Sequence, residues 1–195
     1  MIIVFRVALK CLFLFLTFSS SLSAQEKVEV ERTVDASEVP NEAQEWVNDT
    51  YEAPDRMHWY LEESGNGRSY EAKFKYRGQW HSVEFGEDGT LQDIEIVVRG
   101  RELPATVRQP IQAYLDSTYT RHRIRKIQRQ LSGEPDALRR AVRTASANGI
   151  NERYEIEFYG KNAQEDALWE GLFDDQGQLL QRRKIVLRPT DNLIY

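Results

Sequence analysis

Four sequence landmarks occur twice in this chain in the same order, and this duplication constrains the fold more than any other feature. Each copy begins with alternating apolar residues, followed by Glu-Val-Pro or Glu-Leu-Pro, then Tyr-Glu-x-x-Phe, then Phe-x-x-x-Gly-x-Leu. The landmarks lie at residues 28–34, 38–40, 70–74 and 85–91, and again at 94–98, 102–104, 154–158 and 173–179. A duplicated unit of about 65 to 90 residues is the simplest explanation, so both units should fold alike.

Within each unit, the apolar periodicity predicts one helix followed by strands. After the proline, apolar residues recur at the spacing of one helix face. They are Ala43, Trp46, Val47 and Tyr51, and then Val107, Ile111, Leu115 and Tyr119. Pro110 lies early in the second run and is expected to delay that helix by one turn.

Strand-like runs separated by turn signals such as Asn66-Gly67 and Arg77-Gly78 complete each unit. The runs lie at 57–62, 69–76, 79–85 and 90–98, and at 123–131, 153–159, 167–173 and 179–187. Each helix is expected to cover one face of its own four-stranded antiparallel sheet, which is an α+β architecture.

Residues 1–24 have the parts of a secretory signal peptide and are set apart from the fold. Arg6 and Lys10 precede a short apolar run, and small residues end the segment at Ala24. The run is too short to cross about 30 Å of hydrocarbon, which argues against a membrane anchor. Cleavage after Ala24 would leave 171 residues without cysteine. This suits the bacterial periplasm or exterior, so we expect a periplasmic or secreted protein without a membrane span.

The order of these landmarks resembles the PepSY-like proteins, which are exported bacterial proteins with a fold similar to β-lactamase inhibitor protein. The resemblance covers the chain from about Val28 to Leu187. It implies a tandem helix-on-sheet protein, with units at 25–98 and 99–195, that is not an enzyme and binds a protein or peptide. It brings no catalytic residue to this chain. The second unit departs from the first by an insertion of about 20 residues, since Pro40 lies 30 positions before Tyr70 whereas Pro104 lies 50 positions before Tyr154.

The insertion predicts an extra basic helix near residues 135–148. Its apolar stripe is Ala137, Leu138, Ala141, Val142 and Ala145, and Asn148-Gly149 is a stop signal. Arg139, Arg140 and Arg143 should face solvent, near the basic residues between 121 and 129. They would form a docking surface for an acidic partner or an anionic envelope component. Alternatively, they belong to a solvated helix face that pairs with nearby carboxylates.

Strand alternation places Tyr60, Trp80 and Tyr159 on the sheet faces that point away from the helices. The residues expected to face the helices are Trp59, Phe74, Val83, Phe85, Ile156 and Phe158. Outward aromatic side chains among charged ones are typical of protein interfaces. The alternative is that the free faces of the two sheets, or a linker, bury these rings.

The sequence offers no constellation of catalytic, cofactor-binding or metal-binding residues. His58, His81 and His122 do not have the spacing of metal ligands, and neither a G-x-S-x-G segment nor a phosphate-binding loop occurs. Acidic residues such as Glu84 are expected to be solvated rather than paired for glycoside hydrolysis. The chain is therefore not expected to be an enzyme.

Charge is divided unequally between the two units. Residues 25–98 carry a net charge of −11, and residues 99–195 carry +4. This polarity could hold the units together or attract a partner, but a nucleic acid is a poor candidate for an acidic exported chain. We expect an exported non-enzymatic module that binds or inhibits a periplasmic or cell-surface protein or peptide through open sheet faces. The alternative is a structural or folding-assist component of the cell envelope.

Overall fold

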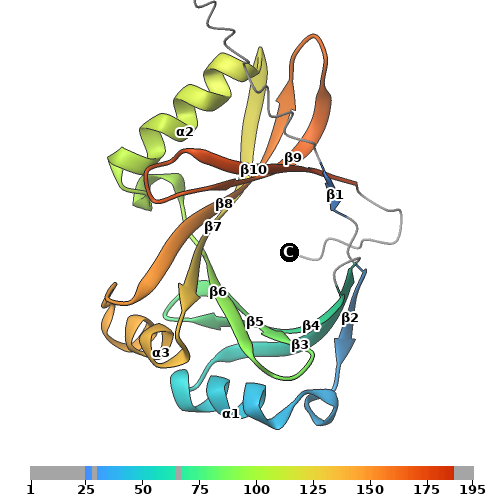
Figure 1. The fold of residues 1–195 in the computed structure, drawn as a ribbon, viewed down its shortest axis with the longest axis vertical. Coiled ribbons are helices and arrows are strands. Elements are labelled where there is room, and N and C mark those ends of the chain that lie inside the picture. The colour runs from blue at the N-terminus through green and yellow to red at the C-terminus, as the bar shows by residue number, and fades with distance from the viewer. Residues whose placement is uncertain (1–24, 28–29, 65–66, 187–195) are drawn as a thin grey trace, which may run out of the picture.

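One curved sheet runs through the whole fold (Figure 1). The computed structural model describes residues 25–27, 30–64 and 67–186, so the predicted signal peptide lies outside the described residues. The strands are β1 (Gln25–Lys27), β2 (Val30–Val34), β3 (Asp55–Ser64), β4 (Gly67–Tyr76), β5 (Gln79–Gly86), β6 (Leu91–Val97), β7 (Arg121–Gly133), β8 (Ile150–Lys161), β9 (Asp166–Phe173) and β10 (Leu179–Ile185). The helices are α1 (Asn41–Thr50), α2 (Ala105–Thr118) and α3 (Pro135–Thr144), with short 3₁₀ turns at Ala36–Glu38 and Gly100–Glu102.

Over the residues that the structure describes, the sheet has ten strands in the order β1-β10-β9-β8-β7-β6-β5-β4-β3-β2. From β2 to β10 each strand pairs antiparallel with the next one along the chain. β1 joins β10 in parallel, with Gln25 opposite Arg183. β1 and β2 therefore follow each other in the chain but lie at opposite edges of the sheet.

All three helices lie outside the curve of the sheet (Figure 1). α1 and α3 cover a core in which Val47 and Leu138 join Phe74, Val83 and Phe85 of the strands. α2 covers a second core, built from Ile111 and Leu115 on the helix and Ile156, Phe158 and Phe173 on the strands. The strand residues expected to face the helices are buried, as the alternation predicted.

The predicted helices form, but two of their details are wrong. α2 begins at Ala105, so Pro110 does not delay it and instead lies inside the helix. The proline removes one backbone hydrogen bond, which burial of Val107 and Ile111 on either side outweighs. α3 ends at Thr144, earlier than predicted, because Ala145 adopts the left-handed conformation with φ of 56°.

The prediction of two separate four-stranded sheets is also wrong. β6, the last strand of the first unit, pairs with β7 of the second from Asp93–Ser132 to Val97–Gln128. An open edge at β6 would leave a row of unpaired backbone groups, and β7 satisfies them. The order of 3₁₀ turn, helix and four strands does occur twice along the single sheet, with α3 inserted between β7 and β8. Its origin by duplication stays a prediction.

Candidate binding surface

The sheet face that points away from the helices is polar, and we call it the inner face because the sheet curves around it (Figure 1). Its composition follows from alternation: Ile94 and Ile96 point into the core, so Asp93 and Glu95 between and beside them point inward to the curve. The inner face includes Tyr60, Glu71, Lys73, Trp80, Glu84, Asp93, Glu95, Gln128, Gln130, Glu155, Glu157, Tyr159, Glu170 and Arg183.

Three carboxylates lie side by side across neighbouring strands of the inner face. The register places Glu71 opposite Glu84, and Glu84 opposite Asp93. Like charges in direct cross-strand register repel one another. Burial, with the charges of Glu84 and Glu71, raises the pKa of Asp93 to about 7, although Gln130 Nε2 donates a hydrogen bond to Asp93 Oδ2 at 3.0 Å. Asp93 is therefore only partly ionised at neutral pH.

Glu95 extends this crowding of acids toward the second unit. Burial raises its pKa well above the ordinary value, and the charges of Glu155, Asp93 and Glu71 add to the effect. Gln128 Nε2 donates a hydrogen bond to Glu95 Oε2. A positive charge brought close to the centre of the inner face would therefore favour the ionised forms of Asp93 and Glu95.

Three cations of the inner face, Lys73, Lys126 and Arg183, are engaged in ion pairs. Lys73 Nζ lies 2.6 Å from Glu31 Oε2 and 2.8 Å from Glu71 Oε2. Burial opposes ionisation of Glu71, but the charge of Lys73 and hydrogen bonds from its neighbours bring the pKa of Glu71 below its ordinary value. On the far strands, Arg183 lies 2.7 Å from Glu170 and Lys126 lies 3.6 Å from Glu157.

One group of carboxylates has the spacing of metal ligands. Oxygen atoms of Glu31, Glu62 and Glu71 lie within 4.8 Å of one another. The Lys73 amine forms ion pairs with two of these three groups, so the positive charge that they favour comes from the protein itself. The cluster is therefore accounted for as an ion-pair network.

The three aromatic side chains predicted as partner anchors all lie on the inner face. Trp80 is 44% exposed, whereas Tyr60 is half-buried beneath Lys73, whose Nζ lies 4.9 Å from the ring centroid. Tyr159 is half-buried and donates a hydrogen bond to Asp166 Oδ1 at 2.7 Å. Because they occupy β3, β5 and β8, the rings are separated by polar strands and do not form one aromatic patch.

The predicted basic surface is split in two. α3 follows the end of β7, whereas Arg121, Arg123 and Arg125 lie at its start, beside α2 (Figure 1). A strand rises about 3.3 Å per residue, so about 30 Å of β7 separates the two groups. The prediction that they lie near each other is wrong, because it treated a strand as a compact segment.

The three α3 arginines have different surroundings. Arg139 lies 3.8 Å from Asp136, and Arg143 donates a hydrogen bond to the Asp49 carbonyl of α1. Arg140 is exposed. Two of the three side chains thus make contacts within the protein, as the solvated-face alternative predicts, and Arg140 is the one most available to a partner.

The residues at the centre of the inner face are not among those predicted from the sequence as site residues. Asp93 and Glu95 alternate with Ile94 and Ile96, and Gln128 and Gln130 are spaced in the same way on β7. Polar residues at every second position of two neighbouring strands indicate a polar sheet face. That signal was present, but the pairing of β6 with β7 was not foreseen.

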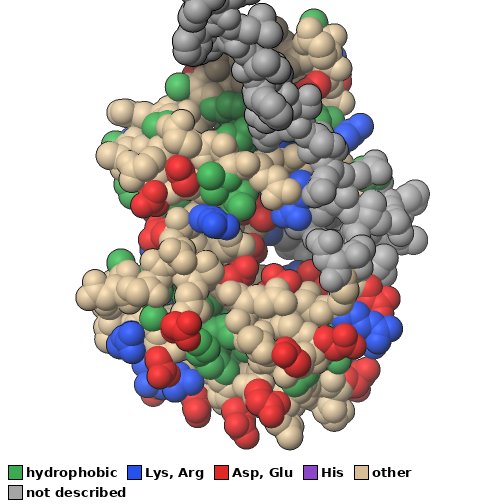
Figure 2. Space-filling model, in the orientation of Figure 1, with side chains coloured by type: hydrophobic (Ala, Val, Ile, Leu, Met, Phe, Trp, Pro, Cys, Tyr) green, Lys and Arg blue, Asp and Glu red, His purple; other side chains and the backbone are tan. Residues whose placement is uncertain are grey.

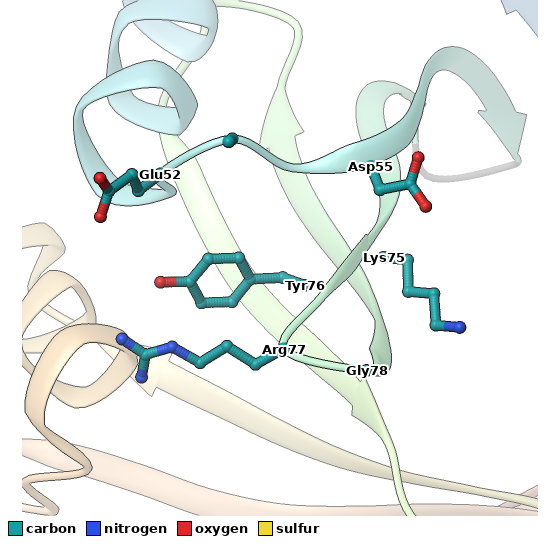
Figure 3. A pocket seen from close by; sticks show the side chains of 7 residues that line it. Glu52, Asp55, Lys75, Tyr76, Arg77 and Gly78 are labelled. Atoms are coloured by element: carbon teal, nitrogen blue, oxygen red, sulfur yellow. The ribbon is translucent and has the colours of Figure 1, made fainter.

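A shallow pocket of about 550 Å³ lies between the end of α1 and the β4–β5 turn. Figure 3 shows Tyr76 and Arg77 pointing to one side of this turn, and Lys75 and Asp55 pointing to the other. The polar groups diverge instead of converging on one point. The pocket therefore lacks the geometry of a catalytic centre.

Figure 2 shows an opening at the middle of the curved sheet, bordered by acidic and basic side chains. Acidic side chains are also spread over the half of this view that carries α1 and β2. In the part of the chain that the structure describes, no helix is both long and apolar enough to cross a membrane. The described residues thus form a polar curved sheet with helices on its outer side.

Solved structures share this fold. A DUF2874 family protein from Bacteroides ovatus aligns with a TM-score of 0.53 at 16% identity, over 75% of this chain and 87% of that one. A candidate periplasmic protein from Bacteroides eggerthii aligns with a TM-score of 0.52 at 15% identity, over 75% and 88%. A BLIP-like protein from Bacteroides fragilis aligns with a TM-score of 0.49 at 13% identity, over 78% and 90%.

No protein-family model matches the sequence, and no curated protein aligns with it. The first of these likenesses defines a fold class: the chain has the fold of a DUF2874 family protein. At these identities the likeness concerns the fold alone.

Proposed function

We propose that this chain is an exported, non-enzymatic binding protein whose inner face holds a positively charged segment of a partner protein or peptide. The observation that carries the proposal is the crowding of Glu84, Asp93, Glu95 and Glu155 on neighbouring strands of the inner face. The cations beside them are already paired with other acids.

The energetics favour a cationic occupant. Burial and neighbouring carboxylates raise the pKa of Asp93 to about 7 and raise that of Glu95 above its ordinary value. A lysine or arginine side chain that enters between them would relieve this repulsion and release protons to solvent. Such binding is electrostatic, so it weakens as salt concentration rises.

Aromatic anchors would supply the apolar part of the contact. Trp80 is the most exposed of the three predicted anchors, and Tyr60 and Tyr159 lie on the same face. A large ring beside a charged centre is the usual composition of an interface hot spot. Arg140, exposed on α3, is a candidate for a separate contact on the outer side.

The predicted cellular location and the resemblance to other proteins complete the proposal. A signal peptide at residues 1–24 would export the chain, and the mature protein without cysteine suits the periplasm. A candidate periplasmic protein shares the fold. The resemblance to PepSY-like proteins, with two tandem units and a fold like that of β-lactamase inhibitor protein, supports a binding or inhibitory role over catalysis.

Site-specific photo-crosslinking of the native exported protein tests the proposal. We would place benzoylphenylalanine at Trp80 on the inner face and, as a matched control, at Ala113, which is exposed on α2. The expected result is one stoichiometric partner captured from position 80 only, through a basic segment. Capture of many envelope proteins would instead favour the structural or folding-assist role.

Variants that replace carboxylates with amides test whether capture of the partner depends on charge. E84Q/D93N/E95Q should abolish the capture, and E42Q/E45Q/D49N, which removes as many charges from exposed positions of α1, should leave it unchanged. Equal capture by both variants would disprove a role for the inner-face carboxylates.

A further inference from the structure

A second hollow lies at the start of β7, away from the acidic centre of the inner face. It has a volume of about 670 Å³ and is lined by Arg121, His122, Arg123, Ile124, Arg125 and Tyr159. Pockets of this size accommodate small ligands. Asp93 is opposite Ser132, nine residues along β7 from Arg123, and Glu155 is opposite Gln128, five residues from it, so about 16 to 30 Å of strand separates the pocket from these acids.

Three arginines of this pocket form no ion pair with any carboxylate that the structure describes. Within residues 30–64 and 67–186, no carboxylate forms an ion pair with Arg121, Arg123 or Arg125. The acidic residues near the pocket form contacts with other groups. The pocket therefore gathers three guanidinium groups that repel one another, and the charge of Arg121 still acts on Asp166 at longer range.

Each neighbouring acid is bound to a different group. Asp116 Oδ1 lies 2.8 Å from His122 Nε2. Asp166 accepts hydrogen bonds from Lys161 and from the Tyr159 hydroxyl. Glu157 lies 3.6 Å from Lys126.

The strand geometry places the three guanidinium groups close together. Arg121 and Arg123 are two residues apart, which puts them on one side of β7 about 7 Å from each other. The register shifts between Ile124 and Lys126, so Arg125 is the extra residue of a β-bulge. Bulges redirect side chains next to binding sites.

We propose that this pocket binds phosphate groups. A guanidinium group matches the geometry of an oxyanion, and the oxygens of one phosphate accept hydrogen bonds from several arginines at once, whereas one arginine already satisfies a carboxylate. Three adjacent arginines thus favour phosphate over an acidic peptide. The phosphate comes either from a soluble oligophosphate or from a phosphate-bearing lipid headgroup of the envelope.

Isothermal titration of the mature protein with inorganic pyrophosphate tests the soluble source. The pocket variant is R121Q/R123Q/R125Q, and the control R99Q/R101Q/R108Q removes the same charge from other exposed positions. We expect the pocket variant to bind pyrophosphate about tenfold more weakly or worse, and the control to stay within about twofold. Circular dichroism checks folding, and the single variant R123Q serves if the triple variant unfolds.

Co-flotation with phosphatidylcholine vesicles containing phosphatidic acid tests the lipid source. Binding of either probe that is lost in the pocket variant and kept in the control supports the proposal and identifies the source. It is overturned if neither probe binds, if both variants lose binding equally, or if oligoglutamate binds more tightly than pyrophosphate. None of these results depends on the inner-face carboxylates, so this proposal and the proposed function fail separately.

Discussion

Replacing Asp93 with asparagine should make the protein more stable at alkaline pH. The carboxyl group has an ordinary pKa of 3.8, and burial with the charges of Glu84 and Glu71 raises it to about 7 in the folded protein. A raised carboxyl pKa means that the folded state binds the proton more tightly than the unfolded state does. The contribution of the protonated Asp93 carboxyl group to the free energy of unfolding is therefore fully present below pH 3.8 and is lost as pH rises through about 7.

The size of the effect follows from the difference in pKa. About three units at about 1.4 kcal/mol each give an upper bound of about 4 kcal/mol. Because Glu84 and Gln130 can adjust around the site, we expect about 2 to 4 kcal/mol at pH 8. For a chain of this length that corresponds to an increase in melting temperature of about 5 to 15 °C. The asparagine stays neutral and can still accept the hydrogen bond from Gln130.

Urea denaturation at pH 4, 6 and 8 measures this difference in stability. The proteins compared are the wild type, Asp93→Asn and the surface control Glu45→Gln. Asp93→Asn should match the wild type at pH 4 and exceed it increasingly toward pH 8, and Glu45→Gln should follow the wild type throughout. If Asp93→Asn is no more stable than the wild type at pH 8, the carboxyl group is not the buried, repelled acid that the register implies.

Three further predictions concern the core and the inner face. Burial, followed by the charges of Arg129 and Arg77, lowers the pKa of His81 to about 4. The free energy of unfolding should therefore fall as pH drops from 6.5 toward 4. In denaturation curves, His81→Phe should remove about 2 to 3 kcal/mol of this loss. Phe158→Ala should cost about 3 to 5 kcal/mol, because the ring is fully buried under α2, and a smaller shift in the urea midpoint would contradict that burial. Trp80→Ala should change the melting temperature little but weaken partner capture about tenfold, and global unfolding would instead make Trp80 a core residue.

Local patterns were enough to predict most elements of the fold. The spacing of Ala43, Trp46 and Val47 identified α1, and the alternation around Phe74 identified which side of β4 is buried. Both signals depend on neighbours in the sequence and on the periods of helix and strand. The joining of the two units was not predictable in this way, because the pairing of β6 with β7 depends on backbone groups of an edge and not on side-chain pattern.

The candidate surface was predictable only in part. Alternation placed Tyr60, Trp80 and Tyr159 on the correct face. The contacts that give the inner face its chemistry join residues far apart in sequence, such as Lys73 with Glu31 and Gln130 with Asp93. Their pKa values depend on burial by the curved sheet, which no single segment encodes.

The positions of β1 and β2 explain why the sheet has to curve. In a flat sheet, strands spaced about 4.8 Å apart would put the two edges of a ten-stranded sheet about 43 Å from each other. Yet Lys27 ends β1 and Val30 begins β2 at the opposite edge, and three peptide units span at most about 11 Å. The edges must therefore approach each other there, which encloses the inner face like an incomplete barrel. A partner that contacts Asp93 has to insert a protruding segment past the ends of the strands. A partner with a broad flat surface could not reach this residue.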